Sequence, residues 1–363
     1  MMTNHSLNIS GGTEKATYSA GMSYLAQDGI MDVENYYRRL NFRAALDYEA
    51  RKWLKVGFNG VFSNSQQQLP KNAAWQQAYN TPSIIPVYDD RRDDAVFPKK
   101  YTSPEQVGLT NNFNNPVATA NYYDNRNETY QVLTNFYAQL NLIPDKLNIR
   151  SSYSYDYSMI RGSEFTPTYY VGTNQKKEVT ELTKKNTNYY KYIWDNVATY
   201  TDKWGKHSFT GMLGASMRQE QYRLLEGTAT NVPEGEDVWK YIALGNKEGA
   251  TVKDDGWKYR GLSYFTRLNY NYNDKYMLMF TFRADGSSKY NDKWGYFPSI
   301  GAAWVISQEP FMKNQNIFEY MKLRASWGKL GNDKIAASAG FASIQNVPVS
   351  YTHLRAHETP EHL

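Results

Sequence analysis

Histidine clusters are the first place to look for chemistry in this sequence, and they give little support for a metal site. Three of the five histidines, His353, His357 and His362, stand near the end of the chain at a spacing typical of one helix face. A zinc site also needs partners that orient its ligands, and no such pattern accompanies these histidines. The run 349–359 resembles a translated frame of an adaptor used in sequencing libraries. We therefore predict that 346–363 is a non-native tail and that the protein has no metal site.

Carboxylates are plentiful, but their spacing selects no catalytic pair. Residues 89–94 combine four aspartates with two arginines. The arginines compete for the carboxylates and the run lacks a calcium-loop signature, so we interpret it as solvated charge. Nothing picks out a glycosidase pair, and no nucleophile elbow, phosphate loop or dinucleotide fingerprint occurs. With no cysteine in the chain, a thiol nucleophile is excluded. We predict neither enzyme activity nor a cofactor.

Aromatic side chains are the remaining candidates for ligand contacts, because they make up 15% of the chain and include 32 tyrosines. An aromatic ring offers a flat apolar face on which a sugar ring can stack. The candidates in long polar connections are Trp75, Tyr79, Tyr88, Trp239 and Tyr241. Two interpretations stay open: these rings contact a ligand or a partner protein, or they anchor small cores within the loops.

Charge and hydropathy remove several classes of protein. The 41 basic and 36 acidic residues are evenly spread, so the net charge of +5 does not indicate nucleic-acid binding. The mean hydropathy is −0.71, and no apolar run approaches the roughly 20 residues of a membrane-spanning helix. Residues 1–6 lack a secretory signal. Taken literally this predicts a cytoplasmic protein, but the pattern below favours Met1 as an internal methionine of a longer one.

Alternation with a period of two dominates the chain and predicts long strands with one apolar and one polar face. The clearest run sets Leu262, Tyr264, Thr266, Leu268, Tyr270 and Tyr272 against Ser263, Phe265, Arg267, Asn269 and Asn271. Similar runs occupy 40–49, 54–62 and 130–142. Such runs last about ten residues or more, whereas a typical soluble strand has about 5–6.

Breaks between the runs alternate between short turns and long polar connections. Short turns are predicted at 11–14, 50–52, 144–146, 202–205 and 273–275, and long connections at 27–35, 64–128, 161–188, 226–256 and 285–295. About twelve strands with this asymmetry are typical of an outer-membrane β-barrel, whose closed pairing satisfies every backbone group in lipid. Aromatic residues near both kinds of break suit interfacial girdles. The alternative is a secreted or surface carbohydrate-binding β-sandwich with no transport role.

Specific motifs resemble a known family. They include the turn Asp285, Gly286, Ser287 and Ser288, the pair Phe297 and Pro298, Trp304, and the pair Gly331 and Asn332. With further matches from about residue 5 to about residue 340, these residues resemble the barrel of the SusC/RagA family, the TonB-dependent (TonB-linked) outer-membrane transporters of Bacteroidetes. In that family the motif is a structural signature of the barrel and has no catalytic role.

The resemblance implies an all-β fold, an antiparallel transmembrane β-barrel. Residues 1–345 would supply about 12 of about 22 strands, with long extracellular loops, the largest at 64–128, and with the plug absent. The implied place is the cell outer membrane, in contact with its lipid. The implied role is import of a large nutrient, a glycan or oligosaccharide and less often a peptide. Its partners would be a SusD-like lipoprotein lid and the TonB complex, reached through a missing N-terminal part.

Overall fold

The computed structural model describes residues 1–89, 101–108, 114–312 and 317–336. In these residues twelve strands form one antiparallel sheet, and each strand pairs with its neighbours in chain order. The strands are β1 (Met2–Gly12), β2 (Ala16–Asp28), β3 (Tyr36–Arg51), β4 (Leu54–Gln68), β5 (Asp124–Ile143), β6 (Leu147–Thr166), β9 (Glu181–Trp204), β10 (His207–Thr230), β11 (Thr251–Tyr272), β12 (Tyr276–Ser287), β13 (Trp294–Val305) and β14 (Lys322–Gly328). Within the described residues β1 and β14 pair on one side only, so the sheet is an open wall.

Smaller elements occupy the connections. They are α1 (Ala73–Asn80), η1 (Pro104–Val107), α2 (Pro116–Asn121), the hairpin strands β7 (Tyr169–Gly172) and β8 (Gln175–Lys177), η2 (Asp237–Trp239), η3 (Ile242–Leu244), η4 (Ile306–Gln308) and η5 (Pro310–Met312). Among the described residues, no helix combines the length and the apolar character needed to cross a membrane.

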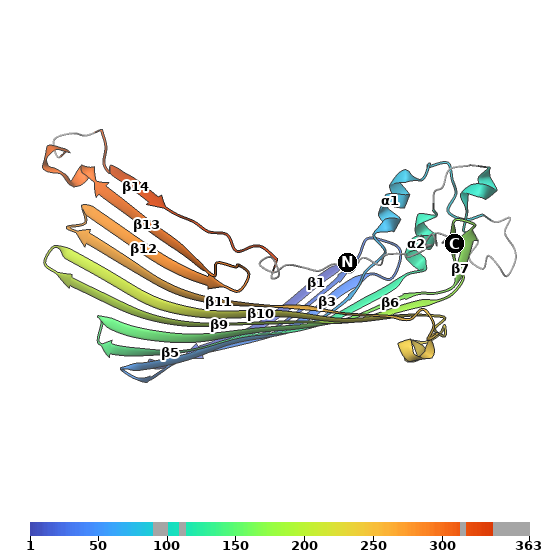
Figure 1. Ribbon diagram of the computed structural model, residues 1–363, viewed down its shortest axis with the longest axis horizontal. Coiled ribbons are helices and arrows are strands. Elements are labelled where there is room, and N and C mark those ends of the chain that lie inside the picture. The colour runs from blue at the N-terminus through green and yellow to red at the C-terminus, as the bar shows by residue number, and fades with distance from the viewer. Residues whose placement is uncertain (90–100, 109–113, 313–316, 337–363) are drawn as a thin grey trace, which may run out of the picture.

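The large sheet is a single curved layer with a concave and a convex face (Figure 1). Its register keeps the two side-chain patterns on separate faces: Tyr264 lies opposite Ala284, and the next residue, Ser263, lies opposite Asp285. The segment after β14 runs over the concave side and contacts Arg218 of β10. Because Arg218 lies in register with Gly261, on the same face as Ser263, the polar rows line the concave face and the apolar rows cover the convex face.

Over most of the wall, none of the described residues packs against the apolar convex face. Leu213, Leu278 and Leu323 are 66%, 52% and 59% exposed. A soluble monomer rarely exposes an apolar patch larger than a few hundred Å², whereas a β-barrel wall presents such a band to lipid. A sandwich would cover this face with a second sheet, yet the other sheet in the described residues is only the β7–β8 pair. The barrel architecture is confirmed, and the sandwich alternative is wrong.

Aromatic rings form a row at the short-turn end of the convex face. The row crosses β9 to β13 in register through Trp204, His207, Tyr272, Tyr276 and Trp304. Neighbouring ring centroids lie 5.7 Å apart for Trp204 and His207, 4.9 Å for His207 and Tyr272, and 6.3 Å for Tyr272 and Tyr276. A continuous belt of this kind is what a lipid headgroup boundary favours.

A second aromatic boundary lies toward the long-loop end. Trp294 stacks on Tyr264 of the convex face at 6.1 Å. Trp257 also stands near a long connection. It lies two residues before Tyr259 on β11, opposite Tyr222, so its side chain points to the same concave side as that of Tyr259. The convex belt at this end is therefore formed by Tyr264, Trp294 and Tyr296 and does not include Trp257.

The strands run much further into the long connections than the sequence pattern predicts. β9 and β10 have 24 residues each, and the connections shrink to 69–123, 167–180, 231–250 and 288–293. The predicted loop bounds, including 64–128, were therefore too wide. Beyond the lipid band both faces of a strand are wet, so the alternation that signals a strand stops while backbone pairing continues.

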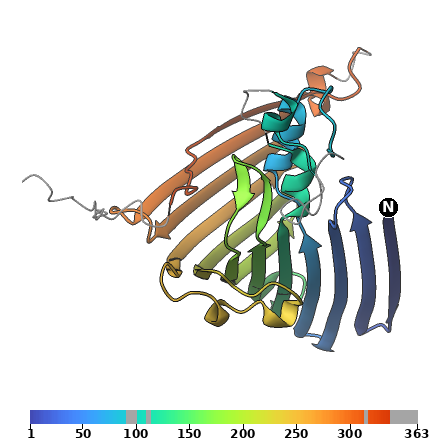
Figure 2. The same ribbon diagram turned by 90° about the vertical axis from the view of Figure 1, so that its right-hand side faces the viewer.

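Two small cores stand at the long-loop end, on opposite sides of the wall (Figures 1 and 2). On the concave side, Tyr101, Ala118 and Val171 join α2 to the β7 hairpin. On the convex side, Ile242 packs on the core formed by Phe165, Leu182, Ala229 and Val232. We call the first group, made of α1, α2, η1 and the β7–β8 hairpin, the loop module.

Candidate functional site on the concave face

Most of the motif residues found in the sequence meet around one hollow of about 560 Å³ on the concave face. The hollow lies between the loop-end parts of β10 to β13 and residues 329–334, which we call the strap. Motif residues in its lining are Asp285, Gly286, Ser287, Phe297, Gly331 and Asn332. The charged residues in its lining are Arg218, Arg283, Asp285, Asp292, Lys293 and Asp333.

Close contact between the strap and Phe297 explains the glycine of the motif. The strap leaves β14 with one more backbone hydrogen bond, from the Lys329 N–H to the Pro298 carbonyl at 3.0 Å. A Cβ at Gly331 would lie 2.3 Å from the Phe297 ring. Only glycine lets the backbone lie flat on that ring without displacing it, so Gly331 sets how closely the strap follows the wall.

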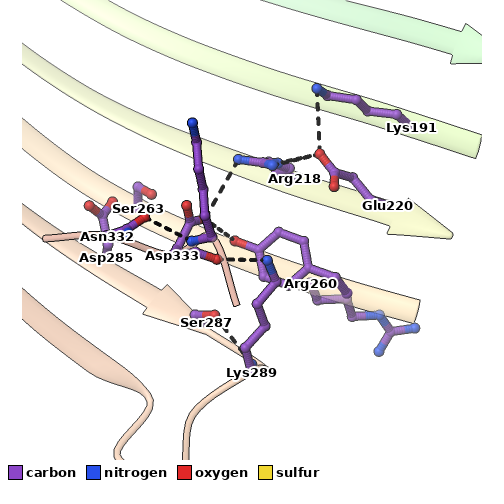
Figure 3. Close-up of polar contacts among 12 residues, drawn as sticks. Lys191, Arg218, Glu220, Arg260, Ser263, Asp285, Ser287, Lys289, Asn332 and Asp333 are labelled. Carbon is purple, nitrogen blue, oxygen red and sulfur yellow. Dashed lines mark hydrogen bonds and ion pairs between the residues drawn. The ribbon is translucent and has the colours of Figure 1, made fainter. Parts of the chain in front are cut away.

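Polar contacts hold the strap across the wall (Figure 3). The Lys289 Nζ donates to the Asp333 carbonyl at 2.8 Å, and the Tyr290 hydroxyl donates to the Asn332 carbonyl at 2.7 Å. The Asp333 carboxylate is held more loosely: its Oδ2 accepts from the Tyr259 hydroxyl at 3.5 Å and lies 3.9 Å from Arg218 Nη1. The backbone of the strap is therefore anchored, while the carboxylate makes long contacts.

Ion pairs organise the floor of the hollow. The Nε and Nη2 of Arg218 hold Glu220 Oε1 at 2.8 and 2.6 Å, and Lys191 lies 3.4 Å from the same oxygen. Arg283 Nε contacts both oxygens of Asp285 at 2.7 and 2.8 Å, and its Nη2 donates to Ser263. Figure 3 shows Lys191 and Arg218 directed at Glu220. Such a surface can bind polar, hydroxyl-rich ligands.

The serines of the motif join β12 to its neighbour. Ser287 Oγ accepts from the Lys289 N–H at 3.2 Å. Ser288 exchanges bonds with Arg260 of β11: its N–H donates to the Arg260 carbonyl at 2.9 Å, and its Oγ accepts from the Arg260 N–H at 3.0 Å. These contacts fix the turn and with it the direction in which Lys289 reaches the strap. The structural role that the resemblance implies for these serines stays a prediction.

Trp304 lies at the opposite end of the wall, away from the hollow. Its Nε1 donates to Glu309 Oε1 at 3.0 Å, the Tyr276 hydroxyl donates to the same oxygen at 2.5 Å, and Lys275 Nζ lies 3.4 Å from Oε2. The hydrogen bond from Tyr276, with those from Trp304 and Lys275, lowers the pKa of Glu309. Glu309 therefore links the connection after β13 to the aromatic row at the short-turn end.

The five loop aromatics predicted as ligand contacts are not brought together. Trp75 and Tyr79 lie on α1, and Tyr79 is 91% exposed. Tyr88 stacks on Tyr101 of the loop module at 5.3 Å. Trp239 and Tyr241 belong to the connection on the convex side of the wall. Their role in binding stays a prediction.

The sequence did not predict a network of buried side-chain amides inside the loop module. Asn115 Oδ1 accepts from the N–H groups of Val117 and Ala118, both at 3.1 Å, and so caps α2. Asn115 Nδ2 donates to the carbonyls of Val87 and Thr102 at 2.9 and 3.2 Å. An asparagine followed by proline is a usable signal, because this pair favours a capped helix start.

Gln175 extends this network to the β7–β8 hairpin. Its Oε1 accepts from the Asn115 N–H at 2.7 Å, and its Nε2 donates to Asn115 O and Thr119 Oγ1 at 3.0 and 2.9 Å. Burial, with the nearby Tyr88 and Tyr122 adding to it, raises the pKa of Tyr101 to about 12. Buried amides and a buried tyrosine therefore join two separate connections in the interior of the module.

Metal ligands do not cluster in the part of the chain that the structure describes: no group of three histidine, aspartate or glutamate side chains lies close enough to hold an ion. His353, His357 and His362, the tail 346–363 and most of the acidic run 89–94 lie outside the described residues. The described site therefore offers hydrogen bonds, ion pairs and ring faces as its means of binding.

Several known proteins are similar to this chain in sequence or in fold. The chain is 30% identical to TonB-dependent receptor P26 of Formosa agariphila over 342 residues, which is 92% of this chain and 33% of that protein. It is 26% identical to TonB-dependent receptor SusC of Bacteroides thetaiotaomicron over 96% of this chain and 35% of that protein. The RagAB peptide transporter structure matches with a TM-score of 0.77 at 20% identity, over 93% of this chain and 37% of that one. No family model matches the sequence.

The fold and these relatives define an outer-membrane β-barrel wall of the TonB-dependent receptor class. Within that class the similarity to SusC agrees with the resemblance of the motifs to the SusC/RagA family. It spans about a third of the length of the curated relatives that it matches. The relatives are receptors and transporters and not enzymes, which agrees with the prediction of no enzyme activity.

Proposed function

We propose that this chain forms part of the wall of an outer-membrane importer that uses TonB energy to bring a large nutrient, a glycan or oligosaccharide, into the periplasm. The observation that carries the proposal is the separation of faces in one sheet. An apolar convex face suits lipid, while the concave face offers ion pairs, amides and hydroxyls to a hydrated cargo. The kinship with TonB-dependent receptors adds the energy source.

A SusD-like lipoprotein is the proposed lid at the long-loop end. The loop module lies there on the concave side, above the polar face (Figure 2). Its helix α1 exposes Trp75 and Tyr79, at 51% and 91%, on a scaffold that is itself held by buried contacts. Exposed aromatic rings on a rigid support are suited to binding a partner protein. A matched test is the retention of the lipoprotein by the full-length parent after Tyr79→Ala, with Tyr88→Ala, a 53% exposed tyrosine that stacks on Tyr101, for comparison.

Peptide cargo is the second candidate, favoured by the likeness to the RagAB peptide transporter. The two cargo classes are separable by experiment. The full-length parent would be expressed in the outer membrane of a Bacteroidetes host, and uptake of labelled oligosaccharides and labelled peptides would be compared with and without TonB. We expect TonB-dependent uptake of an oligosaccharide. Recovery of the parent in the soluble fraction, or uptake that persists without TonB, would overturn the proposal.

A further inference from the structure

The Asp333 carboxylate occupies a place that is built to receive a negative charge. Two cations flank the Tyr259 ring: Arg218 Cζ lies 5.2 Å and Lys289 Nζ lies 4.5 Å from its centroid. The Tyr259 side chain is buried, with the residue 4% exposed, and its hydroxyl points at Asp333 Oδ2. An arginine and a phenolic hydroxyl at one point are donors that suit a carboxylate, and Lys289, which donates to the Asp333 carbonyl, adds a positive charge nearby.

The Asp333 carboxylate makes only long contacts with these donors. Glu220 engages the Nε and Nη2 of Arg218, which leaves Nη1 directed into the hollow, and the nearest Asp333 oxygen is 3.9 Å from it. Both side chains remain in contact with solvent, at 37% exposure for Arg218 and 48% for Asp333. An ion pair this long and this exposed contributes little. A carboxylate that approaches Nη1 and Tyr259 more closely would therefore replace Asp333.

The rest of the hollow fits a sugar ring next to that carboxylate. Its volume of about 560 Å³ lies within the range of small-molecule sites, about 300–1,000 Å³. The Arg283–Asp285 pair and Ser263 offer donors and acceptors to hydroxyl groups. Phe297 also lines the hollow, beside Gly331 of the strap, and its ring is an aromatic surface against which a sugar ring can pack.

We propose that this hollow is a subsite for a sugar ring that bears a carboxylate, and that Asp333 holds the carboxylate position until an acidic oligosaccharide displaces it. The proposal rests on the proposed glycan import and names the substrate class of the same lumen. The lining without Asp333 has three cations, Arg218, Arg283 and Lys293, against two carboxylates, Asp285 and Asp292. An anionic ligand therefore meets a net positive lining once it displaces the Asp333 carboxylate.

Binding to the purified full-length parent tests this subsite without any need for TonB. The probes are trigalacturonic acid and the neutral trisaccharide maltotriose, measured by calorimetry at fixed ionic strength. Asp333→Asn keeps the shape of the strap and removes the competing charge. We expect it to tighten trigalacturonate binding about two- to fivefold, the range of an exposed ion pair. Maltotriose binding should not change.

Two further variants separate direct displacement from general charge effects. Asp292 also lines the hollow, so Asp292→Asn alters the net charge equally, and we expect a smaller change in affinity from it. Arg218→Gln should weaken trigalacturonate binding about tenfold, while Arg218→Lys retains part of it and shows that the fold is intact. Equal effects of Asp333→Asn and Asp292→Asn, or weaker binding in Asp333→Asn, would overturn the subsite. TonB-dependent uptake of neutral glycans would still stand in that case.

Discussion

Two regions of this protein are stabilised in opposite ways. One is the lower wall, by which we mean the part of the sheet between the two aromatic rows, and the other is the loop end. Between the two aromatic rows the convex face exposes its apolar side chains, such as Leu278 at 52%, and no layer formed by the described residues covers them. At the loop end, Leu182 and Val171 are fully buried in small cores, and buried amides pair with one another. The lower wall therefore depends on lipid for its apolar contacts, whereas the loop end carries cores like those of a soluble protein.

A charge on the lipid-facing side of the lower wall should have the largest effect. Leu268 lies midway between the aromatic rows, opposite Phe280 of β12. We expect Leu268→Arg to lower the free energy of unfolding of the full-length parent in lipid vesicles by about 2–4 kcal/mol, because the cation would sit near the bilayer midplane. Denaturant titration followed by heat-modifiable gel migration measures this change.

The matched control is the next residue along the same strand. Asn269 lies on the concave face, opposite Met279, and lines a hollow together with Gly301. We expect Asn269→Arg to leave the unfolding free energy nearly unchanged, since its side chain faces water. If both arginines destabilised the parent equally, the assignment of the two faces would be wrong.

Removal of the helix cap in the loop module should have a smaller and local effect. Asn115→Ala removes two bonds to the start of α2 and two to the carbonyls of Val87 and Thr102. We expect the module to lose about 2 kcal/mol of local stability, seen as faster hydrogen exchange around α2. The gel mobility of the barrel should stay that of the wild type.

Asn121 supplies a control at the other end of the same helix. Its exposed side chain donates a single bond to the Val117 carbonyl at 2.9 Å. Asn121→Ala should therefore accelerate exchange much less than Asn115→Ala. A loss of barrel stability in Asn115→Ala would contradict the separation of the loop module from the lipid-supported wall.

The short-turn end should give the smallest effect, and one that depends on pH. The hydrogen bond from Tyr276 is the main cause of the lowered pKa of Glu309 in the folded state. The unfolded state then binds more protons, so this contribution is complete above the ordinary glutamate pKa of about 4.3 and is lost as pH falls through the lower folded value. The melting temperatures of wild type and Glu309→Gln should differ at neutral pH and converge in acid.

Glu14 provides the comparison for that titration. It stands exposed in the turn between β1 and β2, at the same end of the wall. Glu14→Gln should leave the melting temperature unchanged over the whole pH range. Parallel curves for wild type and Glu309→Gln, with no convergence in acid, would show that the Glu309 contacts contribute no pH-dependent stability.

Much of the wall could be predicted because its pattern is local. A residue such as Leu268 and its neighbour Asn269 differ in polarity, and the strand geometry alone sends them to opposite faces. Short turns with polar residues close the hairpins, as at Asn273, which adopts a positive φ of 51°. The approximate number of strands and their hairpin connections followed from this repetition, whereas the resemblance to a family came from separate motifs. The outer ends of β9 and β10 could not be predicted, because a strand with two wet faces shows no alternation.

The candidate site was only half predictable. The motif residues Phe297, Gly331 and Asn332 are conspicuous in the sequence as a family signature, yet nothing local shows that they surround one hollow with Arg218 and Tyr259 of two other strands. The loop aromatics were predicted as one class. The structure separates Trp75 and Tyr79 from Trp239 and Tyr241 by placing their connections on opposite sides of the wall.

The sequence by itself determined the faces, the hairpins and the kind of membrane element, since these depend on the period of two and on turn chemistry within a few residues. Only the tertiary structure decided what the strap covers and which loops share a core. Asp333 lies 115 residues along the chain from Arg218, and their contact depends on the curvature of the sheet between them. Contacts over such distances leave no local pattern, because curvature and register, not neighbouring residues, bring them together.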